Sequence, residues 1–161
     1  MPVADNTSDF PLVTVIAVCY NHEKYVVECL EHIRAQTYKN TELIIMDDCS
    51  KDNSVSIIND WIAKYSVACT FIAHTQNVGL CKTLNEALSH ARGEYISMMA
   101  TDDIWDPDKI ERQMTVMLQQ PETVAVVYSD TLQIDEVGKL LPNTFLEVQR
   151  PGFIPPSGCV F

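Results

Sequence analysis

The sequence is poor in glycine and in clustered positive charge. Its five glycines form neither a Gly-x-Gly-x-x-Gly segment nor a Gly-x-x-x-x-Gly-Lys-[Ser/Thr] loop, which argues against Rossmann dehydrogenases and P-loop NTPases. The net charge is −11, with 22 acidic against 11 basic residues, and Lys and Arg are scattered along the chain. Nucleic-acid binding through a basic surface is therefore not expected.

Long apolar runs and closely paired cysteines are also missing. No apolar run approaches the ~20 residues of a membrane-spanning helix, and residues 1–9 are too polar for a signal peptide. The six cysteines form no Cys-x-x-Cys motif and no cluster with zinc spacing. Free thiols fit a reducing compartment. We expect a soluble cytoplasmic chain, with the inner face of the membrane as an alternative location for a longer parent protein.

What the sequence does contain is an alternation of short apolar runs and amphipathic helical patterns. Strands are predicted at 13–19, 43–46, 68–73, 95–100 and 124–128. Helices are predicted at 23–36, 54–65, 80–91 and 107–118, with Gly93 as a left-handed residue after the third. This alternation predicts an α/β fold with a doubly wound, mostly parallel sheet and helices on both faces.

The chain is long enough for one substantial core, and its composition suggests three parts. Residues 1–10 are expected to be a disordered or extended N-terminus, and residues 11–130 to form one folded domain. Residues 131–161 lose the helical rhythm and read as an extended segment leading to a strand at 159–161. We interpret this last part as the start of a further region that the chain does not complete.

Two pairs of adjacent aspartates, Asp47-Asp48 and Asp102-Asp103, each follow a predicted strand. Ligands of open α/β sheets bind beyond the carboxyl ends of the strands, and adjacent carboxylates repel unless a cation or proton intervenes. The pairs therefore predict a site where Mg²⁺ or Mn²⁺ meets a phosphorylated ligand. Simpler alternatives stay open: the first pair could complement a helix N-terminus, and the second could form a surface turn.

The segment between the third strand and third helix carries Asn77, Gly79 and Lys82. Turn chemistry alone explains the Asn and Gly, because both tolerate positive φ. The alternative is that the helix N-terminus and Lys82 face a diphosphate. The histidines have no metal-ligand spacing and are interpreted as structural: His22, His32, His74 and His90.

Six motifs follow one another in order between residues 11 and 128. They are the strand 13–19 with Tyr20-Asn21, Gln36-Thr37-Tyr38, the stretch 42–54 around Asp47-Asp48, Asn77-x-Gly79 with Asn85, Gly93-Glu94-Tyr95, and Thr101-Asp102-Asp103. One such motif would be weak, but the ordered set resembles the nucleotide-sugar-binding part of family 2 inverting glycosyltransferases of the GT-A fold.

The resemblance implies metal-dependent transfer of a sugar, with inversion, from a nucleoside-diphosphate sugar to an unidentified acceptor. A UDP-sugar is the expected donor, and a saccharide, a lipid-linked saccharide or another compound the acceptor. Asp103 would bind Mn²⁺ or Mg²⁺, Asp48 would contact the base, and Asp102 the ribose or donor. The full nucleotide-binding set would be Val18, Tyr20, Asn21, Asp48, Asn77, Gly79, Lys82 and Asp102.

Two departures from the family pattern limit what the resemblance implies. Val18 stands where the family usually has Pro, at the rim of the base pocket. The family's catalytic base and acceptor-binding elements lie downstream of the position of Phe161, so no catalytic residue is assigned and the chain is expected to be catalytically incomplete.

Three other functions were weighed against the glycosyltransferase. One is a nucleotide-sugar-binding fragment or degenerate homologue without turnover. A receiver-like domain would place its acidic pair after the first strand, where Tyr20-Asn21 stands instead. A nucleotidyltransferase would need a glycine-rich basic loop after that strand, and the sequence has none there.

Overall fold

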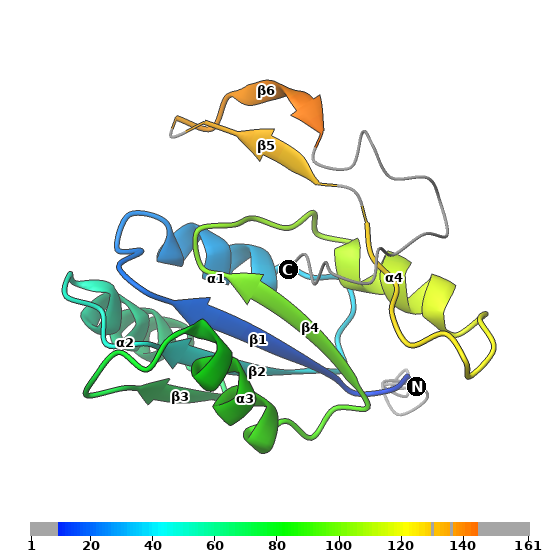
Figure 1. Ribbon diagram of the computed structural model, residues 1–161, viewed down its shortest axis with the longest axis horizontal. Coiled ribbons are helices and arrows are strands. Elements are labelled where there is room, and N and C mark those ends of the chain that lie inside the picture. Colours follow the sequence, from blue (N-terminus) through cyan, green and yellow to red (C-terminus); the bar gives the residue numbers. More distant parts are fainter. Residues whose placement is uncertain (1–9, 130, 136, 145–161) are drawn as a thin grey trace, which may run out of the picture. The chain divides into compact units, whose positions relative to one another are not determined.

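The computed structural model describes residues 10–129, 131–135 and 137–144 (Figure 1). Contacts between residues divide the chain into two compact units, Met1–Arg112 and Gln113–Phe161. Among the described residues, no helix has both the length and the apolar character that a membrane crossing requires.

The first unit is built on a four-stranded parallel sheet in the order β3-β2-β1-β4. Its strands are β1 (Val13–Cys19), β2 (Thr41–Asp47), β3 (Cys69–Ala73) and β4 (Tyr95–Ala100). The helices that connect or follow them are α1 (Val26–Arg34), α2 (Ser54–Tyr65), α3 (Leu80–His90) and α4 (Lys109–Met117), the last of which spans the boundary between the units. Helix α3 covers one face of the sheet, and α1 and α2 lie together on the other (Figure 1).

Strand β1 is the centre of the core, because all seven of its residues are buried. It lies between β2 and β4, and its near-continuous apolar sequence is typical of a parallel strand that is covered on both faces. On the α3 side, Ile16 and Val18 pack with β2 residues against Leu84 and Ala87 of the helix. The four predicted strands of this unit and their helices are confirmed, with shifts of a few residues at their ends.

Gly93 has a different role from the one expected. Helix α3 ends at His90, the next residue Ala91 is extended, and Gly93 does not have a positive φ, so the prediction of a left-handed residue was wrong. A Cβ at Gly93 would lie 2.5 Å from the backbone nitrogen of Thr14. Glycine is required here because the chain entering β4 passes very close to the start of β1.

The second unit contains an antiparallel hairpin of β5 (Leu132–Ile134) and β6 (Leu140–Thr144). The strand predicted at 124–128 was wrong, since these residues form no regular element and Val126 is 61% exposed. An apolar run needs a pairing partner to become a strand, and no described strand pairs with this one. The strand predicted at 159–161 lies outside the described residues.

Candidate functional site

Both acidic pairs lie at the carboxyl edge of the sheet, on either side of the end of β1. The N–H of Asp48 donates to the carbonyl of Cys19, and the N–H of Thr101 donates to the carbonyl of Val18. The loops that follow β1, β2 and β4 therefore begin next to one another. This is the edge at which open α/β sheets bind their ligands.

The loops after β1 and β2 are tied together by hydrogen bonds. The N–H of Asn21 donates to Ser50 Oγ (2.8 Å), and the Asn21 side-chain oxygen accepts from the N–H of Lys51 (2.7 Å). Asn21 has a φ of 60°, a left-handed conformation that asparagine tolerates better than most residues. The N–H of Glu23 donates to Asp52 Oδ2 (2.9 Å), which links the two loops again. Tyr20 is 43% exposed at the edge of the sheet, and these hydrogen bonds restrain the backbone of the loop that carries it.

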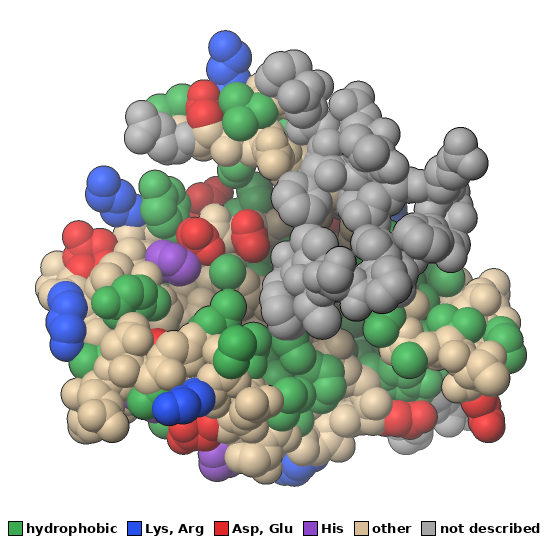
Figure 2. Space-filling model, viewed as in Figure 1, with side chains coloured by type: hydrophobic (Ala, Val, Ile, Leu, Met, Phe, Trp, Pro, Cys, Tyr) green, Lys and Arg blue, Asp and Glu red, His purple; other side chains and the backbone are tan. Residues whose placement is uncertain are grey.

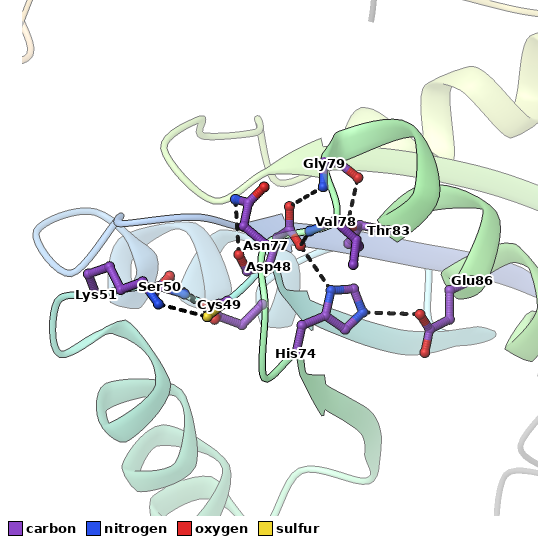
Figure 3. A network of polar contacts seen from close by, with 11 residues as sticks. Asp48, Cys49, Ser50, Lys51, His74, Asn77, Val78, Gly79, Thr83 and Glu86 are labelled. Carbon is purple, nitrogen blue, oxygen red and sulfur yellow. Dashed lines mark hydrogen bonds and ion pairs between the residues drawn. The ribbon is translucent and has the colours of Figure 1, made fainter.

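The first acidic pair is buried and its carboxylates are occupied by internal donors. Asp47 accepts hydrogen bonds from the backbone and hydroxyl of Ser50 and shapes the turn after β2. Asp48 Oδ1 accepts from Val78 N (2.8 Å) and His74 Nδ1 (3.0 Å), and its Oδ2 accepts from Gly79 N (2.8 Å) (Figure 3). Asp48 thus fastens the loop between β3 and α3 to the end of β2.

These contacts decide the ionisation of Asp48 and His74. Burial disfavours the charged carboxylate of Asp48, but the hydrogen bonds from His74, Val78 and Gly79 together lower its pKa below the ordinary value. The hydrogen bond to Asp48 raises the pKa of His74, burial of the ring opposes this, and Glu86, 3.1 Å from Nε2, adds to the rise. The arrangement therefore favours a carboxylate next to a protonated imidazole.

The N-terminus of α3 receives Asp48. Gly79 is the residue before the helix and has a φ of 87°, a conformation that side-chain-bearing residues rarely adopt. Its N–H and that of Val78 point at the Asp48 carboxylate, so an acid of the first pair complements the helix dipole here. These two backbone donors are therefore engaged by Asp48, whereas a diphosphate at the start of α3 stays a prediction. Asn77 donates to the Asp48 carbonyl (3.2 Å), and Lys82 is exposed on α3.

The second acidic pair is exposed in the turn after β4. Asp102 Oδ2 lies 3.6 Å from His22 Nε2, and His22 Nδ1 lies 2.9 Å from the hydroxyl of Thr101. The carboxylate of Asp103 accepts no hydrogen bond from a described residue. Protein atoms around it and, to a smaller extent, the negative charge of Asp102 raise the pKa of Asp103, and His22 opposes the rise. Exposed acidic side chains next to a histidine are visible on the surface in Figure 2.

The loop that carries the second pair is fastened from the C-terminal end of α1. His32 Nδ1 donates to the carbonyl of Trp105 (2.7 Å), and Gln36 Nε2 donates to that of Asp106 (2.8 Å). Gln36 Oε1 also accepts from the N–H of Ile110 in the first turn of α4 (3.1 Å). Gln36 is 3% exposed, so its amide links two helices and the acidic loop from within the protein.

Sequence reasoning missed the histidines. His22, His32 and His74 each contact a loop of the candidate site, whereas all four were interpreted as structural. Each partner lies far along the chain, so no spacing rule could find it. The available signal was position, because His74 directly follows β3 and His22 comes three residues after the end of β1, at the ligand-binding edge.

The carboxylates of Asp102 and Asp103 are the hard oxygen ligands that Mg²⁺ and Mn²⁺ prefer. Among the described residues, no group of three or more His, Cys, Asp or Glu side chains is placed to hold a metal ion. Mg²⁺ is commonly held by one or two carboxylates together with phosphates of the substrate. The residues present therefore fit an ion that binds together with a phosphorylated ligand.

Residues 14–153 match the model of the Glycosyl transferase family 2. The chain belongs to this family. EpsE of Bacillus subtilis strain 168 is 36% identical over 144 residues, which cover 89% of this chain and 51% of EpsE. An uncharacterized glycosyltransferase of Rickettsia typhi is 34% identical over 126 residues, covering 78% of this chain and 38% of the relative. The chain thus spans about half, or less, of the length of these relatives.

Two solved structures resemble the fold. The mannosyltransferase PcManGT from Pyrobaculum calidifontis, in complex with GDP-Man and Mn²⁺, superposes with a TM-score of 0.65 at 30% identity, over 74% of this chain and 35% of that one. S. aureus TarS in complex with UDP-GlcNAc gives 0.60 at 25% identity, over 66% and 31%. These similarities confirm the predicted GT-A type α/β fold.

Proposed function

We propose that this chain is the donor-binding domain of a metal-dependent glycosyltransferase. The observation that carries the proposal is the exposed pair Asp102-Asp103 at the ligand-binding edge of the sheet. The carboxylate of Asp103 accepts no hydrogen bond from a described residue, and the like charge of Asp102 stands beside it. A divalent cation with a diphosphate would relieve that repulsion and complete a coordination shell.

The donor is proposed to be a nucleoside-diphosphate sugar, with a UDP-sugar as the first candidate. TarS is described with UDP-GlcNAc and PcManGT with GDP-Man, so similar folds accept either base. Asp48 would face the base and Tyr20 would border it, while Asn21 and Asn77 hold the surrounding loops in place. Val18 supports this edge from the core, where it packs toward α3.

At the second pair, Asp103 would hold Mn²⁺ or Mg²⁺ and Asp102 would contact the ribose or donor. The ion, when bound, neutralises negative charge on the nucleoside-diphosphate leaving group. The proposed reaction is a single displacement at the anomeric carbon with inversion, in which a carboxylate takes the proton of the acceptor hydroxyl. No residue of this chain is assigned as that base, and the chain alone is proposed to bind donor without transferring sugar.

Calorimetric titration of UDP and GDP, with and without Mn²⁺, tests this function on the wild type and on Asp103→Ala. We expect metal-dependent binding that the substitution abolishes. Asp60→Ala is the matched control, since Asp60 is an exposed aspartate on α2. Absence of binding to UDP, GDP, CDP and dTDP would contradict a donor site, and metal-independent binding would contradict the role of Asp103. Sugar transfer by the chain alone would contradict its catalytic incompleteness.

A further inference from the structure

The ring of His74 is held between two carboxylates that come from different elements. Its Nδ1 lies 3.0 Å from Asp48 Oδ1, after β2, and its Nε2 lies 3.1 Å from Glu86 Oε2, on α3 (Figure 3). An ionised carboxylate only accepts hydrogen bonds, and a neutral imidazole carries a single N–H. Both contacts are therefore satisfied at once only by the imidazolium, which has two. The side chains of His74 and Asp48 are 10% and 5% exposed, so water does not substitute easily in this contact, whereas Glu86 is 44% exposed and its carboxylate also meets water.

The same contacts limit what Asp48 can offer to a ligand. A carboxylate has about four lone-pair positions. Val78 N and His74 Nδ1 occupy two on Oδ1, and Gly79 N occupies one on Oδ2. One acceptor position is left, on Oδ2. In either neutral tautomer of His74, a ring lone pair would face one of the two carboxylates, and Asp48 or Glu86 would lose its donor.

We propose that His74, held as an imidazolium by Glu86, is a positioning residue that fixes the Asp48 carboxylate against the N-terminus of α3 and leaves Oδ2 as a single acceptor for one ring N–H of a nucleobase. This inference rests on the proposed function, because it concerns the base subsite of the same donor site. It gives His74 and Glu86, neither of which was assigned a role, a specific part in recognition.

A single acceptor position on Asp48 Oδ2 limits which nucleobases can bind next to it. Uracil, thymine and guanine each carry a ring N–H on the edge used for pairing, and that N–H can donate to Oδ2. Cytosine and adenine carry a ring lone pair at the corresponding position, which would face the carboxylate. We therefore expect UDP, dTDP or GDP to bind more tightly than CDP and ADP by about tenfold, the usual worth of a charge-assisted hydrogen bond.

Binding should also depend on the proton of His74. Among the described residues, the charged groups that bear on the ring are Asp48 and Glu86, and both raise the pKa of His74 above 6.5. Nucleotide affinity should stay constant below that pKa and fall by about tenfold as the pH rises through it, as the charge-assisted hydrogen bond is lost. In His74→Asn this fall should be absent, and in Glu86→Gln it should occur at lower pH.

The first experiment is an NMR titration of the histidine rings, which needs no nucleotide. His74→Asn identifies the His74 resonance, and His90→Asn is the matched control, since His90 is exposed in the last turn of α3. We expect His74 to titrate above 6.5 and the Glu86→Gln variant to titrate at lower pH. A His74 ring that titrates at or below its ordinary value, or that Glu86→Gln leaves unchanged, overturns the inference.

The second experiment is calorimetry with UDP and CDP, in the presence of Mn²⁺, at about pH 6 and about pH 8.5, on either side of an ordinary histidine pKa. Ionisation of the ligand is shared by all variants, so the difference between wild type and His74→Asn isolates the ring. If UDP binds with the same pH profile in both proteins, the inference fails while the proposed function stands. If the wild type binds no nucleotide at either pH, both fail. The dependence on Asp103 tests the proposed function separately.

Discussion

The two aspartate pairs have the same sequence and both stand at the carboxyl end of a parallel strand, yet the structure places them in opposite environments. Asp47 and Asp48 are buried, and five hydrogen bonds from protein donors end on their carboxylates. Asp102 is 47% exposed, and the described partner of its pair is His22 at 3.6 Å. The first pair organises the edge of the sheet, whereas the second leaves its oxygens available to a ligand.

The position of each strand explains this difference. Strand β2 has neighbours on both sides, β1 and β3, and the donors to its acidic pair come from its own loop and from the loop after β3. Strand β4 has β1 as its one described neighbour in the sheet, so fewer backbone N–H groups reach its end. The acidic pair after a strand with two neighbours is therefore enclosed by donors, and the pair after β4, which has one neighbour among the described strands, keeps its carboxylates exposed.

The largest expected effect is a difference in the free energy of unfolding between a variant of the first pair and a variant of the second. Asp48→Ala would leave the N–H groups of Val78 and Gly79 and the His74 ring without their acceptor. We expect a loss of about 3 kcal/mol in the free energy of unfolding, as for one partner removed from a buried charged network. Asp103→Ala, which removes no described hydrogen bond, should change it by no more than about 0.5 kcal/mol. Urea denaturation of both variants is the measurement, and equal losses would break the comparison.

A second prediction concerns how the open pair keeps its place. Gln36→Leu preserves the size of the side chain but leaves the buried N–H of Ile110 without its acceptor and removes one of the two donors to the carbonyl of Asp106, the other being the N–H of Lys109. We expect a loss of about 2 kcal/mol in stability, the usual cost of an unsatisfied buried group. Because the acidic loop loses an anchor, metal-dependent UDP affinity should fall as well.

The control for Gln36→Leu is the conservative variant Gln36→Glu, measured by the same denaturation and calorimetry. The protonated carboxyl of this variant can accept from Ile110 and donate to Asp106, whereas its ionised form would bury a charge beside carbonyl oxygens, so it should recover part of the stability at acidic pH. A Gln36→Leu protein with wild-type nucleotide affinity would show that this clamp does not position the second pair.

Most of the sheet was predictable from sequence, because its signal is local. The seven buried residues of β1 and the spacing of Val26, Leu30 and Ile33 on α1 follow directly from hydrophobic periodicity. The strand expected at 124–128 had the same local signal and no partner, which periodicity cannot reveal. Gly93 shows the same limit, since its neighbour Thr14 is 79 residues away in the chain.

The position of the candidate site was predictable, but the different roles of its two aspartate pairs were not. Both aspartate pairs were expected at the carboxyl edge, and both lie there. That Asp48 is surrounded by donors and Asp103 is not depends on Val78, Gly79 and His74, which reach Asp48 only after the sheet has formed. The sequence shows that residues 77–79 can form a turn. It does not show how many of the backbone N–H groups in that turn will point at one carboxylate.

The smallest expected effect is a pH dependence confined to the first pair. The pKa of His74 is raised above 6.5 in the folded protein, so its stabilising contribution is complete below that value and is lost as the pH rises through the raised pKa. The pKa of Asp48 is lowered below 3.8, so its contribution is complete above that value and is lost as the pH falls through the lowered pKa. The two are present together between about pH 4 and 6.5.

His74→Asn should therefore cost about 1 kcal/mol within that window, the usual net worth of a hydrogen bond, and less at pH 9. Denaturation of wild type and variant at a series of pH values measures the difference. His22→Asn, at the exposed pair, is the matched comparison, because an ion pair accessible to water contributes little. A loss that is equal for the two variants, or independent of pH for His74→Asn, would mean that the buried pair is not held by an imidazolium. The contrast between a closed and an open aspartate pair would then rest on backbone donors alone.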